Sequence, residues 1–422
     1  MAGHTVESVR AEVRAWLADQ WDPDLTVAQW WERLADSGWA VPTWPEEWHG
    51  RGLSREHAAV VAEELRRAGA AGPPSGLGLL LAGPTILAHG TDEQKRRYLR
   101  PIVTGQEAWC QLFSEPGAGS DLASLQCRAE RDGDEWVVNG QKVWTSTAQL
   151  ADLGMLIART DPDLPKHKGI TYFAIEMDQP GVEIRPLKEM TGRALFNEVF
   201  FDDARVADAA RIGGLTEGWL VANTTLANER AGLGSGGSGA AGAAFPGPKA
   251  GALDQRVGDV AAGPPATGGG GLASRSLGML TDLARTLGRD GEPTVRQGLA
   301  RLHTLNEVGR YTALRAKAAR AAGRAPGPEG NTAKLMMSQI TRLSRDLGMA
   351  ILGPHGMLMG SDTPSGGLVQ EMTLFSPAVS IYGGSDEIQR NIIGERVLGL
   401  PKEPGPDKGT PFRELKVGTQ RA

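Results

Sequence analysis

Apolar residues between positions 109 and 210 follow a two-residue period, whereas helical periods lie on either side. Short alternating runs at 128–131, 135–138 and 141–146 are separated by Asp132-Gly133 and Asn139-Gly140, which are typical of tight turns between strands. Further short runs of this kind lie at 155–158, 170–177, 182–184 and 198–201. Many short strands at such spacing predict a small barrel or sandwich, inserted between two helical regions.

The flanking regions carry helix signals. Ser54 can cap one helix, and Thr91 with Gln94 forms a capping-box pattern ahead of another. Beyond the strands, helices are expected from near Thr216, from near Pro293, after a cap at Asn331 and after Ser385. Four such helices suit an antiparallel bundle. We therefore expect an α+β chain with an N-terminal helical domain (1–108), a middle β-barrel or sandwich domain (109–212), a C-terminal four-helix bundle (213–402) and a tail (403–422).

Residues 231–272 fit neither pattern, because Gly, Ala and Pro dominate and large apolar residues are almost absent. We interpret them as a flexible insert between two bundle helices. Residues 232–237 formally match G-x-G-x-x-G, but they follow a helix and not a strand, so they do not predict a dinucleotide site.

Composition narrows the class. The 422 residues suit two or three domains, and the net charge of −5 gives no reason to expect nucleic acid or an anionic membrane as a partner. Cys110 and Cys127 lack metal-ligand spacing, so we expect no metal site and a reducing, cytoplasmic setting. The acidic N-terminus argues against a signal peptide, and no run approaches the ~20 apolar residues of a membrane span.

Two motifs carry chemistry. Residues 114–121, Ser-Glu-Pro-Gly-Ala-Gly-Ser-Asp, form a turn-rich run whose glycines let the backbone approach a planar ligand, and Trp144-Thr145-Ser146 follows on a predicted strand. Together with Ile-Tyr-Gly-Gly-Ser-Asp-Glu-Ile-Gln-Arg at 381–390, they resemble the acyl-CoA dehydrogenase family from about residue 45 to about 402. The resemblance implies FAD-dependent oxidation of an acyl-CoA thioester to the 2,3-enoyl-CoA, an electron-transfer flavoprotein as electron acceptor, and a homotetramer or a heterotetramer with a related chain.

The resemblance also implies site residues. Donors along the flavin-binding loop would stabilise the charge that arrives with the hydride. The positions matching flavin-lining residues are Phe113, Ser114, Gly119, Ser120, Trp144 and Ser146, and those matching other FAD contacts are Gly353, Ser385 and Glu387. Arg285 and Gln297 match positions that reach the FAD of a neighbouring subunit, with Arg289 as a rival for Arg285. Ser120 and Arg230 match substrate-binding positions.

The catalytic base needs a separate argument. Many members of the family carry a glutamate directly after the tyrosine of the closing motif, where this chain has Gly383. Leu226-Ala227-Asn228-Glu229-Arg230 resembles instead the base motif of the isovaleryl-CoA dehydrogenase type, which makes Glu229 the expected base. Burial beside an acyl group would raise the pKa of Glu229 toward neutrality. Two alternatives stay open: a non-catalytic FAD- and acyl-CoA-binding subunit of a heteromeric dehydrogenase, and a flavin oxidase or monooxygenase. The length, branching and ring character of the acyl group are not readable from the sequence.

Overall fold

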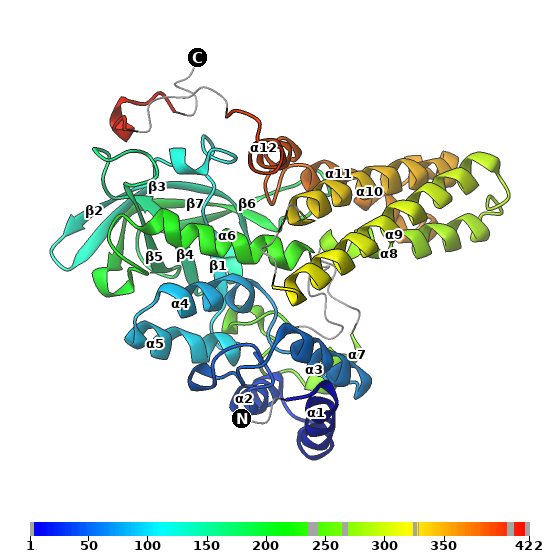
Figure 1. Cartoon of the computed structure of the whole chain (residues 1–422), viewed down its shortest axis with the longest axis horizontal. Coiled ribbons are helices and arrows are strands. Elements are labelled where there is room, and N and C mark those ends of the chain that lie inside the picture. Colours follow the sequence, from blue (N-terminus) through cyan, green and yellow to red (C-terminus); the bar gives the residue numbers. More distant parts are fainter. Residues whose placement is uncertain are drawn as a thin grey trace.

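The structure, a computed structural model, describes residues 4–234, 244–263, 269–323, 327, 329–402 and 409–417. Figure 1 shows a curled sheet with helices below it in the view and a helical bundle projecting to one side. The N-terminal helices are α1 (Val6–Gln20), α2 (Val27–Ser37), α3 (Arg55–Arg67), the π-helical η2 (Gly78–Ala82), α4 (Gly83–His89) and α5 (Asp92–Val103).

The N-terminal helices begin where their capping residues allow. Ser54 caps α3 by accepting from the His57 amide, and Thr91 and Gln94 form a full capping box at α5, as the sequence predicts. Tryptophan side chains fill the centre of this domain. The indole N–H groups of Trp30 and Trp31 are buried and donate to the carbonyls of residues 71 and 72 at 2.8 and 3.0 Å, so these large rings pack without an unsatisfied donor.

The middle domain is a seven-stranded sheet with the order β1-β4-β2-β3-β7-β6, and β5 pairs with the other side of β4. Its strands are β1 (Trp109–Leu112), β2 (Arg128–Asp132), β3 (Glu135–Ser146), β4 (Leu153–Arg159), β5 (Ile170–Glu176), β6 (Val182–Leu187) and β7 (Phe196–Ala207). The β1–β4 pair is parallel, while β2–β3, β3–β7, β4–β5 and β6–β7 are antiparallel. The predicted all-β middle domain is therefore present, as one curled sheet.

The two turn signals inside this domain behave differently. Asp132-Gly133 does close the β2–β3 hairpin, with Gly133 at φ +67°. The prediction of a second turn at Asn139-Gly140 is wrong, because β3 runs straight through it. Gly140 takes φ +147° at a register shift against β7, and a Cβ there would lie 2.7 Å from the Cα of Cys127. The glycine thus marks a bulge under close backbone approach.

The C-terminal bundle consists of α8 (Gly269–Thr286), α9 (Pro293–Ala321), α10 (Glu329–Leu352) and α11 (Leu368–Val379), followed by α12 (Asp386–Arg396). The bundle is confirmed, but its helices differ from expectation, and α8 and α11 were not predicted from the sequence. The helix expected from Thr216, α6 (Gly218–Gly234), lies across the sheet against β5, η2 and α4, although its end also contacts α10. Asn331 lies inside α10 and donates to the Gln389 side chain, so it is not a cap.

The prediction of a flexible insert at 231–272 is wrong for residues 231–234, which end α6, for residues 244–263, and for residues 269–272, which begin α8. Residues 235–243 and 264–268 lie outside the described residues. Residues 244–263 form η6 (Pro248–Ala250) and α7 (Val257–Ala262), and they dock on the N-terminal domain. Backbone hydrogen bonds join residues 253, 255, 257 and 258 to residues 28, 27, 25 and 23 at 2.8–3.0 Å. Val257 is fully buried. The composition of residues 244–263 does not predict this docking, because the hydrogen-bond partners lie in the N-terminal domain.

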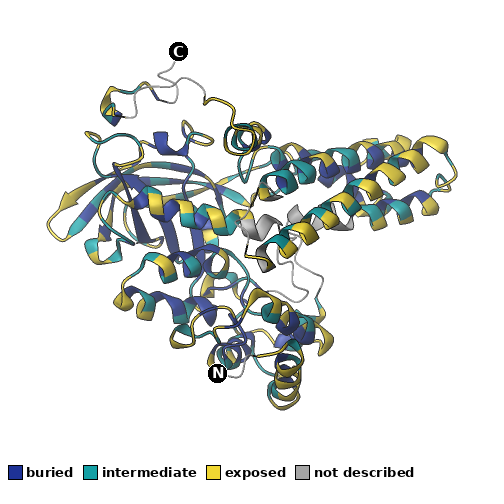
Figure 2. Cartoon of the chain, in the orientation of Figure 1, coloured by how far each residue is buried: buried dark blue, intermediate teal, exposed yellow. Residues whose placement is uncertain are grey.

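The described tail residues 409–417 pack on the middle domain. The Phe412 amide donates to the Leu164 carbonyl, and its ring lies 3.7 Å from the guanidinium carbon of Arg159. Figure 2 shows that the strands are largely buried, whereas the outer faces of the bundle are exposed. None of the helices in the described ranges is long and apolar enough to cross a membrane.

Candidate functional site

The first half of the site is a tight loop that follows β1. The amides of Glu115 and Ala118 each donate to the other residue's carbonyl at 3.0 Å, and the amide of Val143 on β3 donates to the Ser114 carbonyl at 2.9 Å. These bonds hold the loop against the end of β3. Because Val143 directly precedes Trp144, its bond to Ser114 places the two predicted motifs side by side. Within the loop, Phe113 is buried, while Gly119 and Ser120 are exposed.

The second half of the site is Trp144, which is 61% exposed although it is a large aromatic. Its backbone is left-handed, with φ +61°, a conformation that strains a bulky residue. A register shift between β3 and β7 at residues 142–145 accompanies this turn, and the Phe196 ring packs edge-on at 5.9 Å. The strand therefore presents the indole outward at the place where the sequence predicts a flavin.

Some hydroxyl groups around the loop make no hydrogen bond within the protein. In the described part of the chain, the half-buried side chains of Ser114 and Ser146 have no hydrogen-bond partner. The Oγ1 of Thr145 also has none, but Thr145 is fully buried and is not counted as a ligand contact. A Cβ added to Gly119 would meet nothing within 4 Å. An exposed aromatic face, unpartnered hydroxyls and open space beside the loop fit a planar ring system that accepts hydrogen bonds, as an isoalloxazine does.

Glu229 lies next to this loop. It sits near the end of α6, where its carboxylate oxygen Oε2 is 3.4 Å from the Nε2 of Gln111 on β1. Gln111 precedes Phe113 by two positions, so β1 links Glu229 directly to the loop. One turn earlier on α6, the buried Thr225 hydroxyl contacts the Thr85 hydroxyl at 2.9 Å, which ties this face of α6 to α4.

Burial raises the pKa of the Glu229 carboxyl, while the hydrogen bond from Gln111 and the charge of Arg230 act in the opposite direction. Arg230 itself has a lowered pKa, chiefly through burial; the charge of Glu229 raises that pKa and the charge of Arg396 on α12 lowers it. A partly buried carboxylate with a raised pKa beside one arginine is suited to accepting a proton. Gln111 was not anticipated from the sequence, because 118 residues separate it from Glu229.

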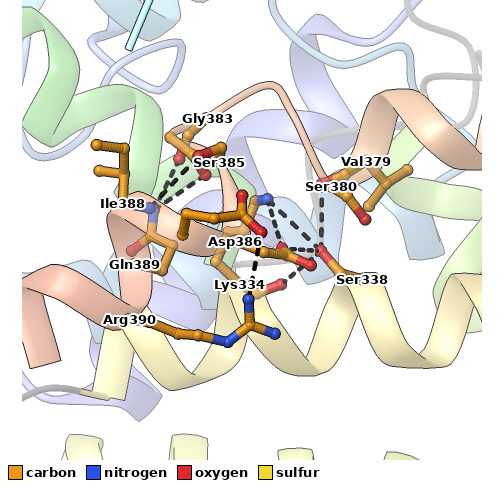
Figure 3. A network of polar contacts seen from close by, with 12 residues as sticks. Lys334, Ser338, Val379, Ser380, Gly383, Ser385, Asp386, Ile388, Gln389 and Arg390 are labelled. Carbon is orange, nitrogen blue, oxygen red and sulfur yellow. Dashed lines mark hydrogen bonds and ion pairs between the residues drawn. The ribbon is translucent and has the colours of Figure 1, made fainter. Parts of the chain in front are cut away.

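The closing motif forms a turn ahead of α12. Gly383 and Gly384 take φ +64° and +80°, which favours glycine at both positions. Ser385 caps α12 by accepting from the Ile388 amide at 3.3 Å, as predicted (Figure 3). Glu387 is exposed and pairs only loosely with Arg390, at 3.4 Å. No carboxylate occupies position 383, so this turn holds its shape without supplying a base.

Asp386 anchors that turn to the bundle. Its buried carboxylate accepts from Lys334 at 3.1 Å and from Ser338 at 2.7 Å (Figure 3). It also accepts from Arg342 at 3.0 Å, and all three donors lie on α10 at four-residue spacing. Burial alone would raise the pKa of Asp386, but the hydrogen bonds from Ser338, Arg342 and Lys334 outweigh it and hold the pKa below its usual value. The four-residue spacing of these polar side chains on α10 is the one sequence signal for this anchor.

The remaining predicted residues lie elsewhere. Arg285 ends α8 and Gln297 lies in the first turns of α9, both exposed, at the end of the bundle that Figure 1 shows pointing away from the sheet. Gly353, at φ +54°, follows α10 at the same end. Arg289, the rival of Arg285, donates to Glu292 and to carbonyls at the end of α10, so its guanidinium is already engaged. Within one chain, these residues do not join the site around Trp144.

Comparison with known proteins agrees with the architecture. Three family models match in chain order: acyl-CoA dehydrogenase N-terminal domain at 3–106, middle domain at 110–204 and C-terminal domain at 265–398. Acyl-CoA dehydrogenase IpdE1 of Mycobacterium tuberculosis is 40% identical over 94% of this chain and 98% of its own. The solved structure of the Tcur3481-Tcur3483 steroid ACAD is 28% identical, with a TM-score of 0.72, over 94% of this chain and 98% of that chain. The ChsE4-ChsE5 complex from Mycobacterium tuberculosis is 29% identical, with a TM-score of 0.70, over 96% of this chain and 100% of that chain.

The chain belongs to the acyl-CoA dehydrogenase family. It is therefore an oxidoreductase that acts on acyl-CoA, and its cofactor is FAD. The exposed Trp144 and the unpartnered hydroxyls beside the loop agree with that cofactor.

Proposed function

We propose that the chain oxidises an acyl-CoA thioester to the 2,3-enoyl-CoA, with Glu229 as the base that takes the α-proton. The observation that carries this proposal is the position of Glu229, partly buried, with a raised pKa, and in contact with the strand that leads into the flavin-binding loop. Ser120 and Arg230 contact the substrate, while Phe113, Ser114, Gly119, Trp144 and Ser146 hold the flavin.

The reaction removes two hydrogens from adjacent carbons. The Glu229 carboxylate takes a proton from Cα, and the electron pair of that C–H bond forms the Cα–Cβ double bond as a hydride leaves Cβ. When bound, FAD supplies the hydride acceptor. Burial favours this proton transfer, because the raised pKa makes Glu229 a stronger base than an exposed carboxylate. An electron-transfer flavoprotein then takes the two electrons.

We further propose that the working assembly pairs this chain with a second, related chain, and that its acyl group is polycyclic. Two observations support this. Two of the solved structures that match nearly the whole chain bear two-chain names, and one of these two is named a steroid ACAD. Arg285 and Gln297 also lie at the far end of the bundle, where they would serve the FAD of a neighbouring subunit, while Gly353, Ser385 and Glu387 would make the other FAD contacts.

Anaerobic mixing of the purified flavoprotein with straight-chain, branched and steroid-type acyl-CoA thioesters tests the proposal. We expect the visible flavin absorbance to bleach, with the steroid-type thioester fastest, and mass spectrometry to show a product lighter by two hydrogens. The same mixtures are run with a co-expressed, related acyl-CoA dehydrogenase chain as the partner.

Three results would redirect the proposal. Bleaching that requires the partner chain and is as fast with Glu229→Gln as with wild type favours the non-catalytic subunit. Rapid oxygen consumption by the reduced protein favours an oxidase or monooxygenase. Bleaching restricted to straight-chain thioesters removes the polycyclic substrate and leaves the dehydrogenase activity.

A further inference from the structure

A buried ion pair lies directly beneath the flavin-binding loop. Lys142 on β3 is fully buried, and its Nζ is 2.8 Å from the Oε1 of Glu115, which is itself 9% exposed. The Nζ also donates to the Phe113 carbonyl at 3.1 Å. The Glu115 carboxylate accepts from the backbone amides of Gln126 at 2.6 Å and Cys127 at 2.9 Å. Both charged groups are therefore satisfied by groups inside the protein.

This ion pair connects the two halves of the site. Glu115 lies inside the loop, in the turn that ends at Ala118, and its carboxylate fixes that turn to the start of β2. Lys142 lies on β3 two residues before Trp144, at the beginning of the register shift that turns the indole outward. One ammonium group thus sets the spacing between the loop and the exposed ring.

Stability gives no sufficient reason for such a pair. Removing two charges from water is costly, and apolar residues of similar volume are often as stabilising. Buried ion pairs are better explained where they fix one geometry among several. Here the groups held by the pair are a backbone loop and a strand end, and these are the segments that the cofactor must fit between.

We propose that Glu115 and Lys142 are positioning residues that set the gap between the loop and Trp144, and so determine how tightly and in which electronic environment FAD is held. This inference rests on FAD lying between these two segments, as the proposed function requires. If the wild-type protein contains no FAD and binds none, the proposed function fails. If the wild-type protein binds FAD and the variants bind it in the same way, this inference alone fails.

The experiment uses Lys142→Met, Glu115→Gln and the double variant in the full-length protein. Each apoprotein is titrated with FAD, and the visible spectrum and reduction potential of the bound flavin are recorded beside a thermal unfolding curve. We expect each single variant to weaken FAD binding at least tenfold and to alter the flavin spectrum or potential. Because one unpaired charge is worse than none, the double variant should lose less than the two single losses combined.

Glu64→Gln is the matched control. Glu64 is also buried, at 2% exposed, and pairs with Arg10 and Arg14, but it lies in the N-terminal domain. This variant should lower the unfolding temperature and leave FAD affinity and the flavin spectrum unchanged.

The proposal is overturned if Lys142→Met folds and binds FAD with wild-type affinity, spectrum and potential. It is also overturned if the flavin properties change only in proportion to the loss of stability, as the Glu64→Gln comparison would show. Should Lys142→Met not fold, the double variant decides the matter, because it leaves neither an unpaired carboxylate nor an unpaired ammonium group. If none of the three folds, the pair is structural and the proposal is wrong.

Discussion

Replacing Glu229 by glutamine is the sharpest test of the proposed chemistry. The change keeps the shape of the side chain and its neighbour Gln111, but it removes the proton acceptor. Loss of a positioned general base lowers a rate by about 10²–10⁴-fold, or about 3–5 kcal/mol of barrier. We expect that loss in the rate of flavin reduction, whereas FAD content and acyl-CoA affinity change little, because glutamine still fills the same space.

The pH dependence adds a second signature. A base works when it is deprotonated, so flavin reduction should fall as the pH drops through the raised pKa of Glu229. Gln111→Leu removes a hydrogen bond that lowers this pKa, and the acid limb of the profile should therefore move to higher pH. At 3.4 Å that hydrogen bond is long, and we expect its loss to cost about 1 kcal/mol or less.

The assay is anaerobic stopped-flow reduction of the bound flavin by the preferred thioester, over a range of pH. Glu217→Gln is the control, since Glu217 is exposed and directly precedes the same helix, about three turns before Glu229. Equal rates for wild type and Glu229→Gln would show that Glu229 is not the base. An unchanged acid limb in Gln111→Leu would show that the limb belongs to another group. If adding Gly383→Glu to the Glu229→Gln variant partly restores the rate of flavin reduction, both positions reach the α-carbon of the thioester.

Three further outcomes are expected. The purified protein should be yellow and release FAD on denaturation, and a colourless protein that also fails to bind added FAD would contradict the assignment. Val257→Ala should lower the free energy of unfolding by about 2 kcal/mol, because it removes two buried methyl groups and leaves a small cavity; a change below 0.5 kcal/mol, within ordinary surface-mutation scatter, would show that the insert is not docked. Asp386→Asn should cost about 3 kcal/mol by leaving Lys334 buried without its carboxylate. The lowered folded-state pKa of Asp386 means that its contribution is present at neutral pH and is lost as the pH falls through that pKa, so the variant should flatten the acid side of the stability curve.

Local signals were readable from the sequence. The caps at Ser54, Thr91 and Ser385 depend on residues within one helical turn, and all three are present. The order of helices, strands and helices follows from the period of the apolar residues, which reflects which face each element buries. These features need no knowledge of distant contacts.

Features that depend on distant partners were not readable. Residues 244–263 contain few large apolar side chains, yet the N-terminal domain supplies carbonyls and amides that hold them in place. The sequence of α6 does not show which elements cover this helix, and β5, η2 and α4 proved to be its partners. Asn139-Gly140 has the composition of a hairpin turn, and only the approach of Cys127 makes it a bulge instead.

The closing motif and the base perform separate tasks in this chain. Gly383 offers no catalytic side chain. The turn around it nevertheless has the Ser385 cap, and Asp386 anchors the turn to three side chains of α10. Such an anchor would be superfluous if the turn served only to carry a base. Its retention is explained if the turn has to hold Ser385 against a ligand, while α6 supplies the carboxylate from the opposite side. Under that interpretation, contact with the cofactor determines the residues of the closing motif, whereas the catalytic base can be supplied either by this turn or by α6.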